Sequence, residues 1–175
     1  TETIGAYAFA GWENLRTVVL VDTLTSIGSN AFYGCNNIEY TTHDNGLYIG
    51  TATNDLFVLV SATNTMITSC SISDKTVIIG ENAFAKCASL TSVIIPEDVV
   101  EIGANAFMSC TSLSEIVFNG TALKSIGANA FTACTKLTNI SLPSSVETIG
   151  AYLFYGCSQL KEIELPNAIQ SIGVY

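Results

Sequence analysis

The stretch IGANAFMSC, from Ile102 to Cys110, returns almost unchanged as IGANAFTAC, from Ile126 to Cys134. Seven of the nine positions are identical, including the glycine, the phenylalanine and the cysteine. Similar Ile-Gly pairs run along the whole chain, at successive intervals of 23, 52, 23, 24, 23 and 23 residues. Self-similarity of this kind indicates a stack of repeated structural units, and it decides the fold. The pairs begin at Ile4, Ile27, Ile79, Ile102, Ile126, Ile149 and Ile172.

An apolar element of the form L-x-x-I-x-L follows the phenylalanine and cysteine positions of the repeat. A period of roughly 20–29 residues that carries this element is the signature of a leucine-rich repeat. Alternate side chains of a strand point to opposite sides, so the element predicts a strand with one buried face. The elements begin at residues 15, 38, 67, 90, 113, 137 and 160, which predicts seven stacked strand rungs.

One rung is longer than the others, with 29 residues between its strand element and the next. It contains the β-rich runs LYIG (47–50) and LFVLV (56–60) on either side of TATN (51–54). Two such runs around a turn-rich link predict a β-hairpin. We therefore expect an irregular rung at about residues 44–66, in which a hairpin replaces the short helical turn that we expect on the other side of each rung.

The remaining part of each rung is predicted to be a short helical turn. An asparagine precedes the Ala-Phe pair in several copies and would cap that turn. The glycine after isoleucine would provide a positive φ at little cost. The expected fold is thus an α/β, right-handed leucine-rich repeat solenoid (horseshoe), with residues 1–175 as a single domain. The capping residues would be Asn30, Asn82, Asn105 and Asn129.

The repeat I-G-x-x-A-F-x-x-C-x-x-L-x-x-I-x-L-P resembles that of the BspA-like leucine-rich repeat family, most clearly from Leu142 to Gly173. The resemblance covers nearly the whole chain and implies the solenoid fold. It also implies a surface protein of a bacterial or protozoan mucosal organism that adheres to host proteins such as fibronectin. Because the chain starts at TETIG and stops at QSIGVY, inside the repeat pattern, we expect it to be a segment of a longer protein.

The composition excludes some classes of partner. The chain has 6 Lys and Arg against 15 Asp and Glu, for a net charge of −9. Nucleic-acid binding needs clustered basic residues, so we predict no nucleic-acid partner. No apolar run approaches the roughly 18 residues of a membrane span, so direct membrane insertion is not expected.

Five of the six cysteines share one repeat position, and Cys70 lies at an inward strand position. Neighbouring rungs lie about 5 Å apart, which leaves disulfides between rungs as an alternative. The simpler interpretation is a column of free, buried thiols. Zinc sites need cysteine pairs two to four residues apart, and the closest pair here is 17 apart, so no metal or other cofactor is predicted.

Few other residues are candidates for chemistry. His43 is the one histidine, and it lies eight residues after Cys35. A partly buried structural histidine is a simpler interpretation than a Cys–His catalytic pair. Asp44, Asn45, Asn54 and Asp55 surround the hairpin, where turn formation is a better explanation than Ca²⁺ binding.

The predicted binding surface is the outward side of the strands, because stacking aligns their side chains into one surface. A second set of candidates is the turn-side aromatic residues Tyr7, Tyr33, Tyr152 and Tyr155, together with Tyr48 and Phe57 of the hairpin. Two interpretations of an apolar strip at Val19, Ile94 and Val117 stay open: an anchor for a protein partner, or the strand propensity of these residues. The predicted strand-face residues are Thr17, Tyr40, Ser69, Ser92, Ile94, Glu115, Val117, Asn139 and Glu162.

These features predict a non-catalytic protein-binding and adhesion module of a cell-surface or secreted protein, with a host or extracellular-matrix protein as its partner. The sequence leaves two alternatives open. The chain could be an accessory domain of a larger enzyme, with the chemistry on a flanking segment, or a purely structural spacer.

Overall fold

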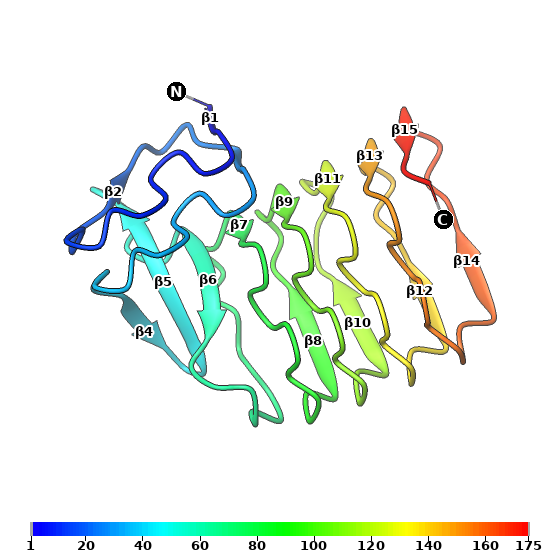
Figure 1. Ribbon diagram of the computed structural model, residues 1–175. Helices are drawn as coiled ribbons and strands as arrows, with labels where there is room; N and C mark the ends of the chain where they lie inside the picture. Colours follow the sequence, from blue (N-terminus) through cyan, green and yellow to red (C-terminus); the bar gives the residue numbers. More distant parts are fainter. Residues whose placement is uncertain (1, 175) are drawn as a thin grey trace.

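The computed structural model describes residues 2–174, which form a β-solenoid of about seven turns (Figure 1). The ends of the expected domain, Thr1 and Tyr175, lie outside the described residues. The strands are β1 (Thr3–Ile4), β2 (Val19–Leu20), β3 (Ser26–Ile27), β4 (Thr41–His43), β5 (Gly46–Thr51), β6 (Val58–Ala62), β7 (Ile78–Ile79), β8 (Ser92–Ile95), β9 (Glu101–Ile102), β10 (Glu115–Phe118), β11 (Ser125–Ile126), β12 (Asn139–Ser141), β13 (Thr148–Ile149), β14 (Glu162–Glu164) and β15 (Ser171–Ile172).

Two rows of parallel strands run along the solenoid. The short strands β7, β9, β11, β13 and β15 pair in sequence and form the upper row in Figure 1. The longer strands form the second row, where β8 pairs with β10 and β12 with β14. Pro96 directly follows β8, where its missing N–H ends the ladder. Each rung thus runs from a short strand through a loop to a longer strand.

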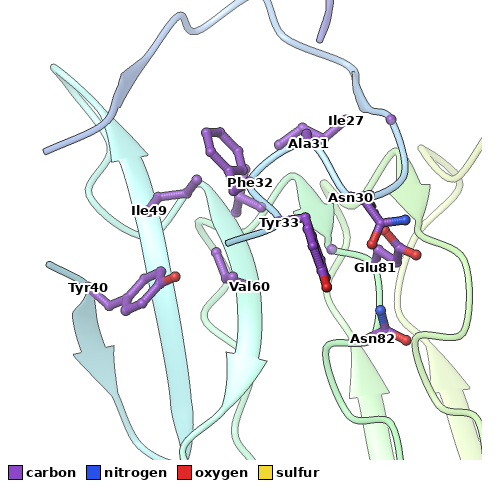
Figure 2. Close-up of a pocket in the computed structure, with 13 residues that line it drawn as sticks. Ile27, Asn30, Ala31, Phe32, Tyr33, Tyr40, Ile49, Val60, Glu81 and Asn82 are labelled. Atoms are coloured by element: carbon purple, nitrogen blue, oxygen red, sulfur yellow. Dashed lines mark hydrogen bonds between the residues drawn. The ribbon is translucent and has the colours of Figure 1, made fainter. Parts of the chain in front are cut away.

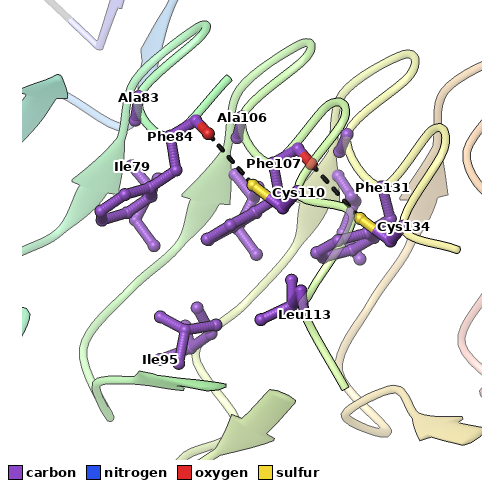
Figure 3. Packing of buried hydrophobic residues seen from close by; sticks show 14 of the residues in the cluster. Ile79, Ala83, Phe84, Ile95, Ala106, Phe107, Cys110, Leu113, Phe131 and Cys134 are labelled. Carbon is purple, nitrogen blue, oxygen red and sulfur yellow. Dashed lines mark hydrogen bonds between the residues drawn. The ribbon is translucent and has the colours of Figure 1, made fainter. Parts of the chain in front are cut away.

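The core between the two rows is a set of stacked columns. Phe84, Phe107 and Phe131 are fully buried, with ring centroids 5.1 Å and 5.4 Å apart and both pairs within 14° of parallel. Figure 3 shows this column beside the column of cysteines. Aromatic rings in an offset stack attract each other beyond the effect of burial. The Phe and Cys recur in the sequence because each packs against the equivalent Phe or Cys of the next rung.

The predicted helical turns are wrong, because residues 2–174 contain no helix. Instead each loop contains two residues with a left-handed backbone, four positions apart. In the loop after β9 these are Asn105, with φ of 56°, and Ser109, with φ of 62°. A left-handed residue cannot continue a right-handed helix, so the asparagines reverse the chain and do not cap it. The fold is therefore a β-solenoid, and the α/β class is corrected.

The role predicted for the glycine after isoleucine is also wrong. None of these glycines has a positive φ within the described residues. A Cβ on Gly127 would lie 2.4 Å from the backbone nitrogen of Ala104 in the previous rung. The repeat needs glycine here because two rungs approach too closely for any side chain.

The predicted hairpin is confirmed, since β5 pairs antiparallel with β6. Its edges continue the parallel sheet, because β5 pairs with β2 and β6 pairs with β7. The sequence did not indicate that β4 adds a third, antiparallel strand. The strand element predicted at residues 67–72 forms no strand. The hairpin therefore spans the sheet between the first two rungs and the regular solenoid.

Candidate functional site

The centre of the predicted strand face lies on β8 and β10. Their register places Ser92 beside Glu115 and Ile94 beside Val117. All four side chains are exposed, and Ile94 keeps 55% of its surface accessible. The residues between them point inward, as Val93 does with 2% exposure. The residues that the alternation predicts to face outward on β8 and β10 are thus exposed to solvent.

The other predicted residues are exposed as well, but they belong to separate blocks. A bond from the Glu39 N–H to the Arg16 carbonyl, 2.8 Å long, aligns Thr17 with Tyr40. The Thr91 N–H donates to the Thr68 carbonyl at 3.3 Å, which brings Ser69 beside Ser92. At the other end, β12 and β14 align Asn139 with Glu162.

Two interruptions divide this face, so the continuous column expected from the sequence is not formed. The hairpin separates the first block, including Val19, from the rungs of β8 and β10. A second break separates β10 from β12, between which no ladder forms. The apolar strip therefore shrinks to Ile94 and Val117, without Val19.

A groove lies at each side of this apolar pair. One, of about 390 Å³, is lined by residues of β10, β12 and β14, including Glu115, Glu162 and Glu164. The other, of about 550 Å³, includes Ser71, Asp74 and Ile94. The strand face thus presents an apolar centre between two acidic grooves. The remaining polar members of the two linings are Asp44, Ser69, Ser92, Asn119, Asn139 and Ser141.

The second set of candidates divides into exposed and buried residues. The turn-side tyrosines are exposed, with accessible fractions of 61% for Tyr7, 69% for Tyr33 and 65% for Tyr155. Tyr48 and Phe57 are buried, at 0% and 4%, so the hairpin aromatics are excluded as contact residues. Burial also raises the pKa of Tyr48 to about 12.

The polar cluster at the hairpin connects segments of the chain. A carboxylate oxygen of Asp44 accepts a 2.7 Å bond from the Ser71 N–H, and the Asn45 side chain donates to the Ser69 carbonyl at 2.9 Å. The Asn54 side chain donates to the Lys75 carbonyl at 2.7 Å. These contacts hold the irregular rung against its neighbours. Within residues 2–174, no group of three or more His, Cys, Asp or Glu side chains could hold a metal ion.

His43 lies at the end of β4 and is partly buried. Its ring makes an edge contact with Tyr48, with centroids 6.2 Å apart. This packing agrees with the structural interpretation of the histidine.

All six cysteines are free and buried. Burial raises the pKa of Cys70 and Cys87 to about 11 and that of Cys110 to about 12. Since the thiolate is the nucleophile, these groups are protonated and unreactive at neutral pH. The simpler interpretation of the cysteine column agrees with the structure.

The sequence matches the family of BspA type leucine rich repeat regions in six copies, over residues 1–58 and 60–175. The chain belongs to the BspA-type leucine-rich repeat family. Six copies over nearly the entire chain agree with the repeated rungs of the solenoid. A search of curated proteins finds no match to this BspA-type chain.

Solved structures of similar proteins share the fold of this BspA-type chain. A leucine-rich repeat protein of T. pallidum has a TM-score of 0.68 and 28% identity, covering 77% of this chain and 64% of its own. One from Bacteroides ovatus has a TM-score of 0.62 and 26% identity, covering 98% of this chain and 43% of its own. A leucine rich cell surface protein from Faecalibacterium prausnitzii has a TM-score of 0.53 and 31% identity, covering 94% and 51%. This chain therefore spans less than two thirds of the length of these three proteins.

Members of the family are generally non-catalytic repeat proteins that mediate protein–protein interaction and are commonly surface-associated. The described residues contain no helix long and apolar enough to cross a membrane.

Proposed function

We propose that this chain is a non-catalytic protein-binding module of a cell-surface or secreted protein, and that it adheres to a host or extracellular-matrix protein. The contact surface is the strand face, defined by Thr17, Tyr40, Ser69, Ser92, Ile94, Glu115, Val117, Asn139 and Glu162. The similarity to a cell surface protein of F. prausnitzii supports the location.

The observation that carries this proposal is the exposed apolar pair on β8 and β10. Ile94 and Val117 are direct neighbours in the ladder, and 55% and 38% of their surfaces are accessible. They stand on a row of buried side chains, so the surface is rigid and loses little entropy on binding. An apolar centre with a polar rim is the usual composition of a protein–protein interface.

The charges around the pair indicate the kind of partner. The acidic side chains Glu115, Glu162 and Glu164 line the groove on one side, and Asp74 lies on the other. A partner with an apolar patch flanked by basic residues would match this surface, since complementary potentials favour the correct encounter.

The experiment is a binding assay of this chain against immobilised extracellular-matrix proteins, with fibronectin first, by biolayer interferometry. The proposal predicts saturable binding to at least one matrix protein and none to serum albumin. Absence of saturable binding to every matrix protein would contradict it, and would favour a spacer or an accessory domain of a larger enzyme.

A further inference from the structure

A cleft on the loop side of the solenoid lies where the hairpin interrupts the repeat. It separates the loop at residues 28–35 from the loop at residues 80–87, and we call it the loop cleft (Figure 2). Its volume is about 240 Å³, below the roughly 300–1,000 Å³ of pockets for drug-sized ligands. The side chains around it include Phe32, Tyr33, Tyr40, Ile49, Val58, Val60, Glu81 and Asn82.

Regular loops are joined to one another by a short ladder of backbone hydrogen bonds. The N–H of Phe84 donates to the carbonyl of Ala106 at 2.6 Å, and the N–H of Lys86 donates to that of Met108 at 2.7 Å. The same two bonds recur from Phe107 and Ser109 to the following loop, each 2.8 Å long. Each loop thus presents N–H donors that bond to carbonyl groups of the next loop.

The loop at residues 28–35 has no following loop to accept its bonds. The N–H groups of Phe32 and Gly34, which correspond to those of Phe84 and Lys86, find no acceptor within residues 2–174. Phe32 is also only partly buried, whereas Phe84 is fully buried. One donor pair and part of one aromatic ring are therefore left open at the loop cleft.

Two carboxylates hold this open loop in position. Glu81 accepts a 2.5 Å bond from the Asn30 N–H and so takes the place of the first acceptor of the missing loop. Glu101 bonds to Ser26 and to the backbone of Ile27, and its burial raises its pKa. Within residues 2–174, β3 pairs with β1 alone. These polar contacts, together with the packing of Ile27 on the cluster that contains Ile78, therefore connect it to the regular rungs in place of a ladder.

We propose that the loop cleft binds a peptide segment of the type basic-x-small-aromatic, which takes the turn conformation of a regular loop and replaces the missing one. The carbonyls on either side of the aromatic residue accept the bonds from Phe32 and Gly34, as those of Ala106 and Met108 do for the preceding loop. The small residue permits the close approach that Ala106 shows with 0% exposure. The aromatic side chain packs on Phe32.

The basic position follows from charge. Glu81 is the one charged residue that lines the cleft, and no Lys or Arg among the described residues pairs with it. The Glu81 carboxylate lies at the Asn30 N–H, where the ladder begins. In the regular loops the equivalent N–H, that of Asn82, bonds to the residue two positions before Ala106, so the basic residue of the ligand lies two positions before its small residue. A basic side chain there meets a carboxylate that has no ion-pair partner among the described residues, on a chain of net charge −9.

The test is a titration of the ¹⁵N-labelled chain with the capped peptide acetyl-GKNAFMS-amide. We expect downfield shifts and slower hydrogen exchange at the amides of Phe32 and Gly34. Peptides with alanine for the phenylalanine, or glutamate for the lysine, should bind at least about tenfold more weakly. No shift at these amides at millimolar peptide would overturn the proposal.

A matched pair of variants locates the peptide. Tyr33→Ala removes an exposed wall of the loop cleft, and Tyr155→Ala removes the corresponding exposed residue from the last complete loop. We expect at least about a tenfold loss of affinity for the first variant and none for the second. A loss only in the Tyr155 variant, or shifts confined to Phe154 and Gly156, would place the peptide at the end of the solenoid and overturn the assignment. Unchanged melting temperatures show that both variants remain folded.

Discussion

The Sγ atom of Cys134 donates a hydrogen bond to the carbonyl oxygen of Phe107, one rung earlier, at 3.3 Å. The same bond joins Cys110 to Phe84 at 3.1 Å and Cys157 to Phe131 at 3.0 Å. Each Phe carbonyl also accepts the N–H of the cysteine in its own rung, as Phe107 does from Cys110 at 3.1 Å. A thiol at this position therefore fastens adjacent rungs while it fills an apolar site.

The cysteines should be reduced and unreactive in the folded protein. Titration with a thiol reagent at pH 8 should find few reactive groups in the native state, because all six thiols are buried and burial raises the pKa of Cys70, Cys87 and Cys110. Denaturation without a reductant should expose all six. Fewer than six in the denatured sample would indicate disulfides between rungs and contradict the Sγ–carbonyl arrangement.

Phe107→Ala should lower the free energy of unfolding by about 3–5 kcal/mol, because it empties a fully buried site between two stacked rings. Urea denaturation followed by circular dichroism measures the change. Phe154→Ala is the matched control, since Phe154 is partly buried and stacks on one ring only, at 5.8 Å from Phe131. Equal losses in the two variants would show that stacking between rungs is not the source of stability.

Gly127→Ala should lower the free energy of unfolding by about 2–3 kcal/mol, because the new Cβ would overlap the backbone of Ala104. Gly5 occupies the same repeat position, but a Cβ there meets nothing within 4 Å. Gly5→Ala should therefore be neutral or stabilising by up to about 1 kcal/mol. If both changes had the same effect in urea denaturation, close approach of the rungs would not be the reason for the glycine.

Ala133→Gly should raise the free energy of unfolding by about 0.5–1 kcal/mol, because Ala133 has a φ of 59° that glycine adopts without steric cost. Gly34 and Gly156 already occupy this loop position with φ of 78° and 75°. The control is Ala106→Gly, at a buried site without a positive φ, which should destabilise. A lower melting temperature for Ala133→Gly would mean that its methyl group contributes more packing than it costs in strain.

The repeat period predicted the rungs, the inward residues and the hairpin because each depends on patterns of apolar residues along the chain. The loops were mispredicted because asparagine favours both a helix cap and a left-handed backbone. The deciding signal was the second position, where Gly34 and Gly156 stand in place of Ser109. Two left-handed positions in one loop exclude a helix.

The alignment of the candidate strand face was predicted only in part, for a related physical reason. Alternation along a strand determines which residues face outward, and it correctly exposed Ile94 and Val117. Whether neighbouring rungs join in a ladder depends on long-range pairing, which alternation does not contain. The break between β10 and β12 and the loop cleft both arise from such pairing. The break between β10 and β12 has a signal in the sequence. Asn119-Gly120 follows β10, whereas a proline follows the corresponding strands of the neighbouring rungs.

The double variant Ile94→Arg/Val117→Arg, assayed with the matrix protein that binds most strongly in the panel, tests most directly whether the strand face is the contact surface. The two arginines alter the centre of the strand face without entering the core. A second double variant, Ile94→Thr/Val117→Thr, removes the apolar pair without adding charge, and Tyr152→Arg/Tyr155→Arg adds the same charge on the loop side. Melting temperatures confirm that each variant is folded.

We predict that both strand-face variants lose at least about tenfold in affinity, measured by biolayer interferometry, while the loop-side variant binds like the wild type. Full affinity in the strand-face variants, together with a loss in the Tyr152/Tyr155 variant, would contradict the assignment of the strand face as the binding surface.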